Sequence, residues 1–498
     1  MDVATFWNDV VNDLNTRDHT GNPAPLDNGG PTRTSRAGAL AHLALHDAYF
    51  KVLGGANPIY MANLPTPPAN SSAAAAASAA CYTVLRTIYK SHGAFVEEKF
   101  ARAPRGTGVH EAISSGLAYG HRIGNILLNR RDQANDATFD ERHGSRRPYV
   151  GSGAFGRHRP DPNNVNQGFL SPYWGKMLMF ATQSLVQLDK PPGWSPDDLD
   201  RTDATYLNHH KEVRMLGGSP TALGVKRRPE ETVVGLFWAY DGAQKLGTPP
   251  RLYNRIVQVL ADKHNLTEAE RVRLFALVNA AMADAGIHAW HWKYVYDLWR
   301  PVIGIREIDF NYGSPAIPGI NLHKEGDPFW LPLGAPSTNA IGARNFTPGF
   351  PAYPSGHATF GSAAFQITRL YLNKLGKIQL LANGGDNASF VYVSEELDGV
   401  AMDADGTQRE RHVRAFASLK QAIVENAVSR VYLGVHWRFD GTLGGFTVGN
   451  VTSAVYDPDA NALDLGPANS KVGGLPLGLK IAEDIFASDL KESAKQFT

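Results

Sequence analysis

Three short segments in the second half of the chain carry cations, a hydroxyl group and two imidazoles. They are residues 293–301 (KYVYDLWRP), 354–359 (PSGHAT) and 429–436 (SRVYLGVH). Lysine and arginine bind oxyanions, and histidine can bind a metal centre or transfer a proton near neutral pH. Together these residue types suit a site for a tetrahedral or trigonal-bipyramidal oxyanion. One imidazole would lie at its apex, and the other would transfer a proton.

The first segment holds two cations, Lys293 and Arg300, which are seven residues apart. On one continuous helix this spacing is two turns, so the sequence predicts that both side chains project from the same face. Their neighbours are largely aromatic and apolar, and two cations are costly to bury there unless an anion lies between them. Taken alone, the pair could equally be two surface residues that form salt bridges.

The second segment lies where a proline-rich loop is followed by an apolar helix. Backbone N–H groups and the positive end of the helix dipole face outward at such a point. Ser355 adds a hydroxyl group, Gly356 lets an oxyanion approach the backbone, and His357 adds a group that titrates near neutrality. Taken alone, Ser355 would be an ordinary helix N-cap.

The third segment contains Arg430 and His436, which are six residues apart. An unbroken helix would not align them, because six residues correspond to about 600° of rotation. We expect Gly434 to end the helix and to let His436 turn back toward the side of Arg430. Taken alone, His436 would be a core histidine, and it becomes a ligand candidate only beside the other two segments.

The helices that position these segments are indicated by apolar residues spaced three and four apart. We expect helices at residues 4–14, 35–52, 71–91, 110–129, 229–246, 250–264, 267–299, 355–375 and 412–433. Glycine and proline predict irregular chain at residues 132–166, 189–203 and 313–354. Strand-like alternation is scarce, so we predict an all-α fold built from helical bundles.

Composition excludes several classes of protein. The 498 residues include 49 Lys+Arg and 48 Asp+Glu, so the net charge of +1 argues against partners such as nucleic acid or an anionic membrane. A single cysteine, Cys81, excludes an internal disulfide and a multi-thiolate zinc site. No stretch is typical of a transmembrane helix or an ordinary signal peptide, so we expect a soluble protein. Its location, including export by a non-classical route, and its assembly into a homo-oligomer stay open.

The order Lys-x6-Arg-Pro, Pro-Ser-Gly-His and Ser-Arg-x5-His resembles the signature shared by type-2 acid phosphatases and vanadium haloperoxidases. Flanking sequence is similar to the fungal vanadium chloroperoxidases in particular. This similarity includes residues 349–361 (GFPAYPSGHATFG), 238–241 (WAYD), 394–397 (SEEL), 434–440 (GVHWRFD), 474–478 (GLPLG) and 42–50 (HLALHDAYF). The resemblance therefore covers most of the chain, more strongly in the second half.

This resemblance implies two four-helix bundles with long irregular loops. We assign them to residues 1–225 and 226–498, with the active site in the C-terminal bundle. Vanadate would be the cofactor, His436 would bond to vanadium, and His357 would be the acid–base group that helps hydrogen peroxide bind and its O–O bond break. The implied cradle for vanadate consists of Lys293, Arg300, Ser355, Gly356 and Arg430. Halide would be oxidised to a hypohalous acid, and vanadium would stay pentavalent.

Four further residues have roles implied by the resemblance. Asp241 resembles the carboxylate that pairs with Arg430, and Asp440 is a candidate partner for His436. Phe350 occupies a position where bromoperoxidases of the family commonly carry histidine, and Trp290 also matches the chloroperoxidase pattern. These two aromatic residues would select chloride as well as bromide, although core packing alone could also account for them.

Two other functions use the same residues. In a phosphatase, His436 would be the nucleophile that forms a phosphohistidine, and His357 would protonate the leaving group. A non-catalytic oxyanion-binding protein would need the cations alone, and the presence of both histidines argues against it. The aromatic residues around Phe350 and the length of the chain favour the haloperoxidase over the phosphatase.

Overall fold

The computed structural model describes residues 1–21, 26–134, 136–140, 149–309, 325–382, 384–444 and 470–497. In this part of the chain the regular structure is almost entirely helical, which confirms the predicted all-α class. The α-helices are α1 (Val3–Asp18), α2 (Gly30–Leu53), α3 (Ala73–Ile88), α4 (Gly93–Ala101), α5 (His110–Gln133), α6 (Asp136–Phe139), α7 (Ala204–Leu216), α8 (Pro229–Phe237), α9 (Pro249–Lys263), α10 (Glu268–Tyr296), α11 (Pro301–Glu307), α12 (Gly356–Lys374), α13 (Leu419–Tyr432), α14 (Arg438–Gly441) and α15 (Gly474–Ala487). Short 3₁₀ helices span Lys90–His92, Trp174–Lys176 and Glu395–Leu397. Two short antiparallel strands, β1 (Phe390–Tyr392) and β2 (Arg414–Phe416), pair with Phe390 opposite Phe416.

The central helix is α10, which is buried along most of its 29 residues. It begins with a capping box, in which the Thr267 hydroxyl accepts from the Glu270 backbone and the Glu270 carboxylate accepts from the Thr267 backbone. Asp284 lies in its buried middle, where its carboxylate accepts hydrogen bonds from the backbone of Phe180, Ala181 and Thr182. These bonds explain how one carboxylate is tolerated in an otherwise apolar helix.

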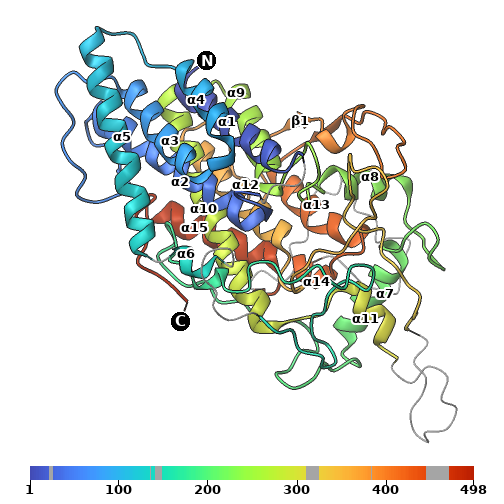
Figure 1. Cartoon of the computed structure of the whole chain (residues 1–498). Helices are drawn as coiled ribbons and strands as arrows, with labels where there is room; N and C mark the ends of the chain where they lie inside the picture. The colour runs from blue at the N-terminus through green and yellow to red at the C-terminus, as the bar shows by residue number, and fades with distance from the viewer. Residues whose placement is uncertain are drawn as a thin grey trace, which may run out of the picture.

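The other helices are arranged around α10 (Figure 1). Helices α1 to α5 lie on one side, α7, α8, α11 and α13 lie on the other, and α10, α12 and α15 lie between them. α10 packs against α2, α12 and α15, and α12 also packs against α13. α7 belongs to the predicted N-terminal bundle but packs against α11 and α13. The division at residues 225 and 226 stays a prediction.

Several helix boundaries differ from the sequence prediction. The helix predicted at 229–246 ends at Phe237, because the chain turns sharply at Tyr240 and Gly242, which have φ angles of 44° and 84°. The helix predicted at 412–433 begins only at Leu419, because residues 414–416 pair with β1 as a strand. Helices α4, α7 and α15 and the short helices α6, α11 and α14 were not predicted, and α6 lies in a segment predicted to be irregular.

Long irregular segments connect the helices, as predicted. Residues 189–203 and 325–354 contain no α-helix. Parts of the predicted irregular segments 132–166 and 313–354 lie outside the described residues. None of the described helices combines the length and the hydropathy that crossing a lipid bilayer would require.

Candidate active site

Lys293 and Arg300 approach one site from two different helices. Lys293 lies in the last turn of α10, which ends at Tyr296, and Arg300 is the N-cap residue of α11. The prediction that both project from one face of a single helix is therefore wrong. The helix ends because Asp297 adopts a left-handed conformation, with a φ of 48°, and Pro301 begins the next helix.

The Lys293 ammonium group is fully buried and holds the loop before α12. It donates hydrogen bonds to the carbonyl groups of Pro351, Ala352 and Pro354, at 2.8, 3.1 and 2.5 Å. Burial, reinforced by the nearby charge of Arg300, lowers the pKa of Lys293 well below its usual value. Because three carbonyl groups already take its three protons, Lys293 has no N–H left to donate to a further acceptor in this arrangement.

The Arg300 guanidinium group is also fully buried, and it connects three parts of the site. Its Nε donates to the Phe350 carbonyl at 2.8 Å, and its Nη1 lies 2.7 Å from the Val435 carbonyl and 2.8 Å from His436 Nε2. Its Nη2 is buried without a hydrogen-bond partner among the described residues. Burial lowers the pKa of Arg300 to about 9.

Arg430, in α13, faces the same site. Its Nη2 donates to both carboxylate oxygens of Asp241, at 2.8 and 2.9 Å. Its Nε and Nη1 have no partner in the part of the chain that the structure describes. With Nη2 of Arg300, three buried guanidinium nitrogens therefore carry unsatisfied N–H groups, which is costly in the absence of an acceptor. An oxyanion between the two arginines would satisfy them.

The turn at Gly434 brings His436 back to this site, as predicted. α13 ends at Tyr432, and Gly434 has a φ of 70°. A Cβ atom at Gly434 would collide with the backbone carbonyl of Gly217, so glycine is required both for the conformation and for the close contact.

His436 is oriented by Asp440, the partner suggested by the sequence. Its Nδ1 lies 2.8 Å from Asp440 Oδ2, which also accepts a hydrogen bond from the Trp437 backbone at 3.0 Å. This network assigns the ring proton to Nδ1 and leaves the Nε2 lone pair facing Arg300. Burial, followed by the charges of Arg300 and Lys293, lowers the pKa of His436 well below its usual value, so the ring is neutral at pH 7.

Ser355, Gly356 and His357 form the start of α12. Ser355 is its N-cap, as predicted, and its side chain accepts from the Ala358 backbone at 3.4 Å. His357 Nε2 lies 2.6 Å from the Ala239 carbonyl and donates to it, so the Nδ1 lone pair remains available. Burial and the charge of Arg430 lower the pKa of His357 well below its usual value.

A small pocket of about 140 Å³ reaches His357. Its wall is mostly apolar and comes from distant parts of the chain: Gly30, Pro31, Leu170, Asp241, Pro249, Phe346, Pro348, Gly349, Phe350, Gly356, His357 and Phe360. The Phe350 ring centroid lies 5.0 Å from Lys293 Nζ and 4.8 Å from Arg300 Cζ. Trp290 is not part of this wall. It packs behind Phe350, with ring centroids 4.8 Å apart.

Comparison with known proteins places this chain in a family. Residues 273–461 match the family model described as the VCPO second helical-bundle domain. The chain is 33% identical to the vanadium chloroperoxidase of Curvularia inaequalis over 575 aligned residues, which cover 98% of this chain and 90% of that protein. The chain belongs to the vanadium haloperoxidase family. This confirms the assignment made from the three sequence segments.

Solved structures share the fold of this haloperoxidase. A bacterial vanadium-dependent iodoperoxidase aligns with a TM-score of 0.65 and 19% identity, covering 98% of this chain and 97% of its own. A holo-type bacterial vanadium-dependent chloroperoxidase aligns with a TM-score of 0.62 and 16% identity, covering 94% of each chain. At these identities the likeness concerns the fold.

Sequence reasoning missed two features of the candidate site. The carbonyl of Ala239 is the partner of His357, and a backbone acceptor leaves no signal in residue type. Pro31 and Leu170 form part of the pocket wall although they lie far from the three segments in sequence. Pro31 reaches the pocket because α2 packs beside it, and Leu170 reaches it from the irregular chain of residues 149–203.

Proposed function

We propose that this haloperoxidase uses vanadate to oxidise chloride and bromide with hydrogen peroxide, giving hypohalous acid. One observation carries the proposal: three buried guanidinium nitrogens of Arg300 and Arg430 have no partner among the described residues, and His436 Nε2 lies 2.8 Å from the other terminal nitrogen, Nη1, of Arg300. Such donors fit a bound oxyanion with a nitrogen ligand. The 33% identity to a vanadium chloroperoxidase supports vanadate as that oxyanion.

The cradle residues have separate tasks in this proposal. The unsatisfied nitrogens of Arg300 and Arg430 would donate to the oxygens of vanadate, together with the Ser355 hydroxyl and the Gly356 backbone N–H. His436 would bond to vanadium through Nε2, because Asp440 holds the proton on Nδ1. Lys293 would complete the cradle, because its charge adds to the electrostatic field that acts on the oxyanion.

His357 and Asp241 serve the reaction itself. When bound, vanadate supplies a Lewis-acidic centre that activates hydrogen peroxide for oxygen transfer to halide. The fixed charges of Lys293, Arg300 and Arg430 draw electron density toward the cradle, which makes the transferred oxygen more electrophilic. His357 Nδ1 takes a proton from peroxide and later returns one to the oxygen that would otherwise leave as hydroxide. Asp241 holds Arg430 in position. The balance is H₂O₂ + X⁻ + H⁺ → HOX + H₂O.

Halide choice depends on Phe350 in this proposal. The apolar wall around His357 would leave a small anion partly desolvated, and Trp290 supports the Phe350 ring from behind. Phe350→His would add a polar, hydrated group. We expect it to lower chloride turnover relative to bromide turnover by about tenfold, which corresponds to about 1.4 kcal/mol. The measurement is the ratio of kcat/KM values for the two halides in the vanadate-saturated enzyme.

The matched control for this variant is Phe346→His, which places the same imidazole in the same pocket. We expect a smaller change in the halide ratio, because the substituted ring is not the one that lies against Lys293 and Arg300. Equal ratios in wild type and Phe350→His would refute the role of Phe350.

The function itself is tested by halide oxidation. The assay uses a chlorination-sensitive dye with hydrogen peroxide and either chloride or bromide, with and without orthovanadate. We expect vanadate-dependent turnover of both halides. Turnover with bromide alone would keep the enzyme class and remove chloride from the proposal. Hydrolysis of a phosphate ester, inhibited by vanadate and without halide turnover, would instead establish the phosphatase.

A further inference from the structure

Two short segments meet directly beside the site. Residues 238–241 follow α8, and residues 394–397 contain the 3₁₀ helix Glu395–Leu397. The Ser394 hydroxyl donates to the carbonyl of Phe237, the last residue of α8, at 2.8 Å, which joins the second segment to the start of the first. Apart from Asp241 and the Ala239 carbonyl, the proposed function assigns no task to them.

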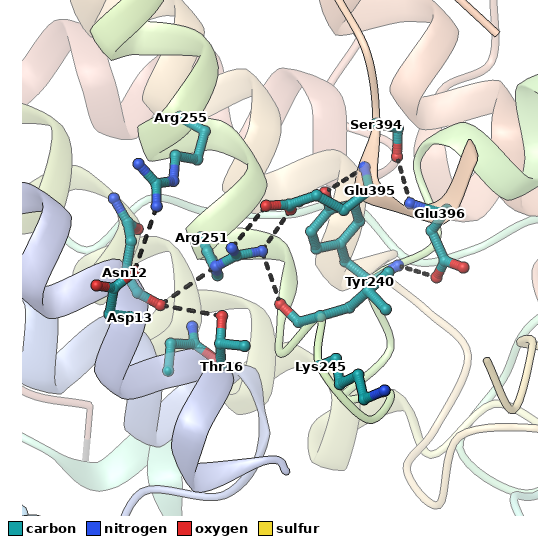
Figure 2. Close-up of polar contacts among 12 residues, drawn as sticks. Asn12, Asp13, Thr16, Tyr240, Lys245, Arg251, Arg255, Ser394, Glu395 and Glu396 are labelled. Atoms are coloured by element: carbon teal, nitrogen blue, oxygen red, sulfur yellow. Dashed lines mark hydrogen bonds and ion pairs between the residues drawn. The ribbon is translucent and has the colours of Figure 1, made fainter. Parts of the chain in front are cut away.

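Tyr240 lies at the centre of this contact (Figure 2). Its hydroxyl donates to Glu395 Oε2 at 2.5 Å and accepts from the Glu395 backbone at 3.0 Å. Its own backbone N–H donates to Glu396 Oε1 at 3.2 Å. Arg251 in α9 holds the Glu395 carboxylate with two nitrogens, at 2.5 and 2.7 Å, and also donates to the Asn12 carbonyl at 3.2 Å. Both the side chain and the backbone of Tyr240 are therefore fixed.

The second acceptor for Tyr240 is itself held firmly. Glu396 is buried, and its carboxylate accepts from Arg409 at 2.5 Å and from the Thr338 hydroxyl at 2.6 Å. A buried carboxylate with these partners has little freedom to move. The Tyr240 backbone N–H therefore donates to an acceptor whose place is set by other parts of the fold.

Tyr240 needs this support because its backbone conformation is unfavourable. Its φ of 44° lies in the left-handed region, which bulky L-residues rarely adopt because the Cβ atom approaches the following carbonyl oxygen. The two residues on either side of this turn, Ala239 and Asp241, each contact a side chain of the site. The carbonyl of Ala239 accepts from His357, and the carboxylate of Asp241 pairs with Arg430. Tyr240 therefore lies between the group that contacts His357 and the group that contacts Arg430.

We propose that Tyr240, fixed by Glu395 and Glu396, is a positioning residue for the active site. It keeps the Ala239 carbonyl on His357, which sets the ring's tautomer, and it keeps Asp241 on Arg430, which aims the guanidinium group at the oxyanion. The inference rests on the proposed function, since vanadate is the oxyanion in question. Tyr240 touches neither vanadate nor substrate in this arrangement and acts only through its two neighbours.

Tyr240→Phe tests this role, because it removes only the hydroxyl group that joins the ring to Glu395. We expect vanadate to bind about tenfold more weakly, as is typical when an outer partner of a ligand is lost. Binding is measured by equilibrium dialysis with vanadium quantified in both chambers. In the vanadate-free protein, ¹⁵N NMR of the histidine rings should show His357 shifting from a single Nε2–H tautomer toward a mixture. Halide oxidation should lose kcat with little change in the KM for halide.

Two further variants separate positioning from stability. Tyr119→Phe removes another buried tyrosine hydroxyl, which donates to the Pro65 carbonyl at 2.8 Å far from the site in the N-terminal helices. It should lower Tm but leave vanadate affinity and the His357 signals unchanged. Glu395→Gln keeps an acceptor for the Tyr240 hydroxyl and should fall between wild type and Tyr240→Phe.

The outcomes distinguish this inference from the proposed function. If Tyr240→Phe lowers Tm as Tyr119→Phe does, while vanadate affinity and the His357 signals match wild type, the positioning role is wrong. If the wild-type protein binds no vanadate, the proposed function fails. The His357 signals of the vanadate-free variants then decide the positioning role on their own.

Discussion

His436→Ala should abolish vanadate binding and, with it, vanadate-dependent halide oxidation. His436 Nε2 lies 2.8 Å from the guanidinium group of Arg300, which also carries an unsatisfied nitrogen, and Asp440 holds the His436 proton on the opposite ring nitrogen. Loss of an outer partner already weakens a metal site by about 10- to 100-fold, so loss of the ligand itself should cost at least about 100-fold in vanadate affinity. Equilibrium dialysis of the purified variant against orthovanadate measures this.

The control for that variant is His42→Ala. His42 is buried in α2, where its Nδ1 bonds to the Gly38 carbonyl at 2.8 Å, and burial lowers its pKa to about 4. Both substitutions remove a buried neutral imidazole, so both should lower Tm. Only His436→Ala should lose vanadate. Wild-type vanadate affinity in His436→Ala would show that the cations alone hold the oxyanion.

The helix cap and the turn in the site could be predicted from the sequence, because each depends on the residue types at a few adjacent positions. Ser355 before an apolar helix predicted an N-cap, and Gly434 after a helix predicted a turn. Both predictions are confirmed, since caps and left-handed turns are set by the residue type at one position. The order and spacing of the three segments identified the family, because they match the set of chemical groups that the family's site requires.

The shared direction of Lys293 and Arg300 was predicted for a reason that is wrong. Seven-residue spacing predicts a shared face only while the helix continues, and here the helix ends at Tyr296. The following residue, Asp297, adopts a left-handed conformation that aspartate reaches at modest cost, so the helix ends earlier than the stop that Pro301 predicts. The two cations still approach one site because the loop after α10 turns Arg300 back toward it.

Contacts from site residues to backbone carbonyl groups of distant segments could not be predicted from residue types. Lys293 donates to carbonyl groups of residues 351–354, and His357 donates to the carbonyl of Ala239. A carbonyl group is present at every position, so nothing in the sequence marks which one will be used. The same applies to the backbone of Tyr240, whose left-handed conformation accompanies hydrogen bonds to Glu395 and Glu396 from a distant segment.

His357→Ala should produce the opposite pattern to His436→Ala: vanadate should still bind, and turnover should be lost. His357 donates to the Ala239 carbonyl and contributes none of the unsatisfied donors, so its loss should change vanadate affinity by no more than about threefold, which is less than the loss of an outer ligand partner costs. General acid–base groups contribute about 10²- to 10⁴-fold to a rate, and we expect kcat/KM for peroxide to fall by that factor.

The roles of His357 and His436 distinguish the three functions considered for this site. Burial and Arg430 lower the pKa of His357 below its usual value, so at pH 7 the ring is neutral and can accept the peroxide proton. A phosphatase would also need His357, as the acid for its leaving group, so His357→Ala should abolish either reaction. A binding protein would need neither histidine for turnover. Full halide turnover in His357→Ala would therefore remove the proton-transfer role, whereas loss of turnover with retained vanadate separates catalysis from oxyanion binding at one side chain.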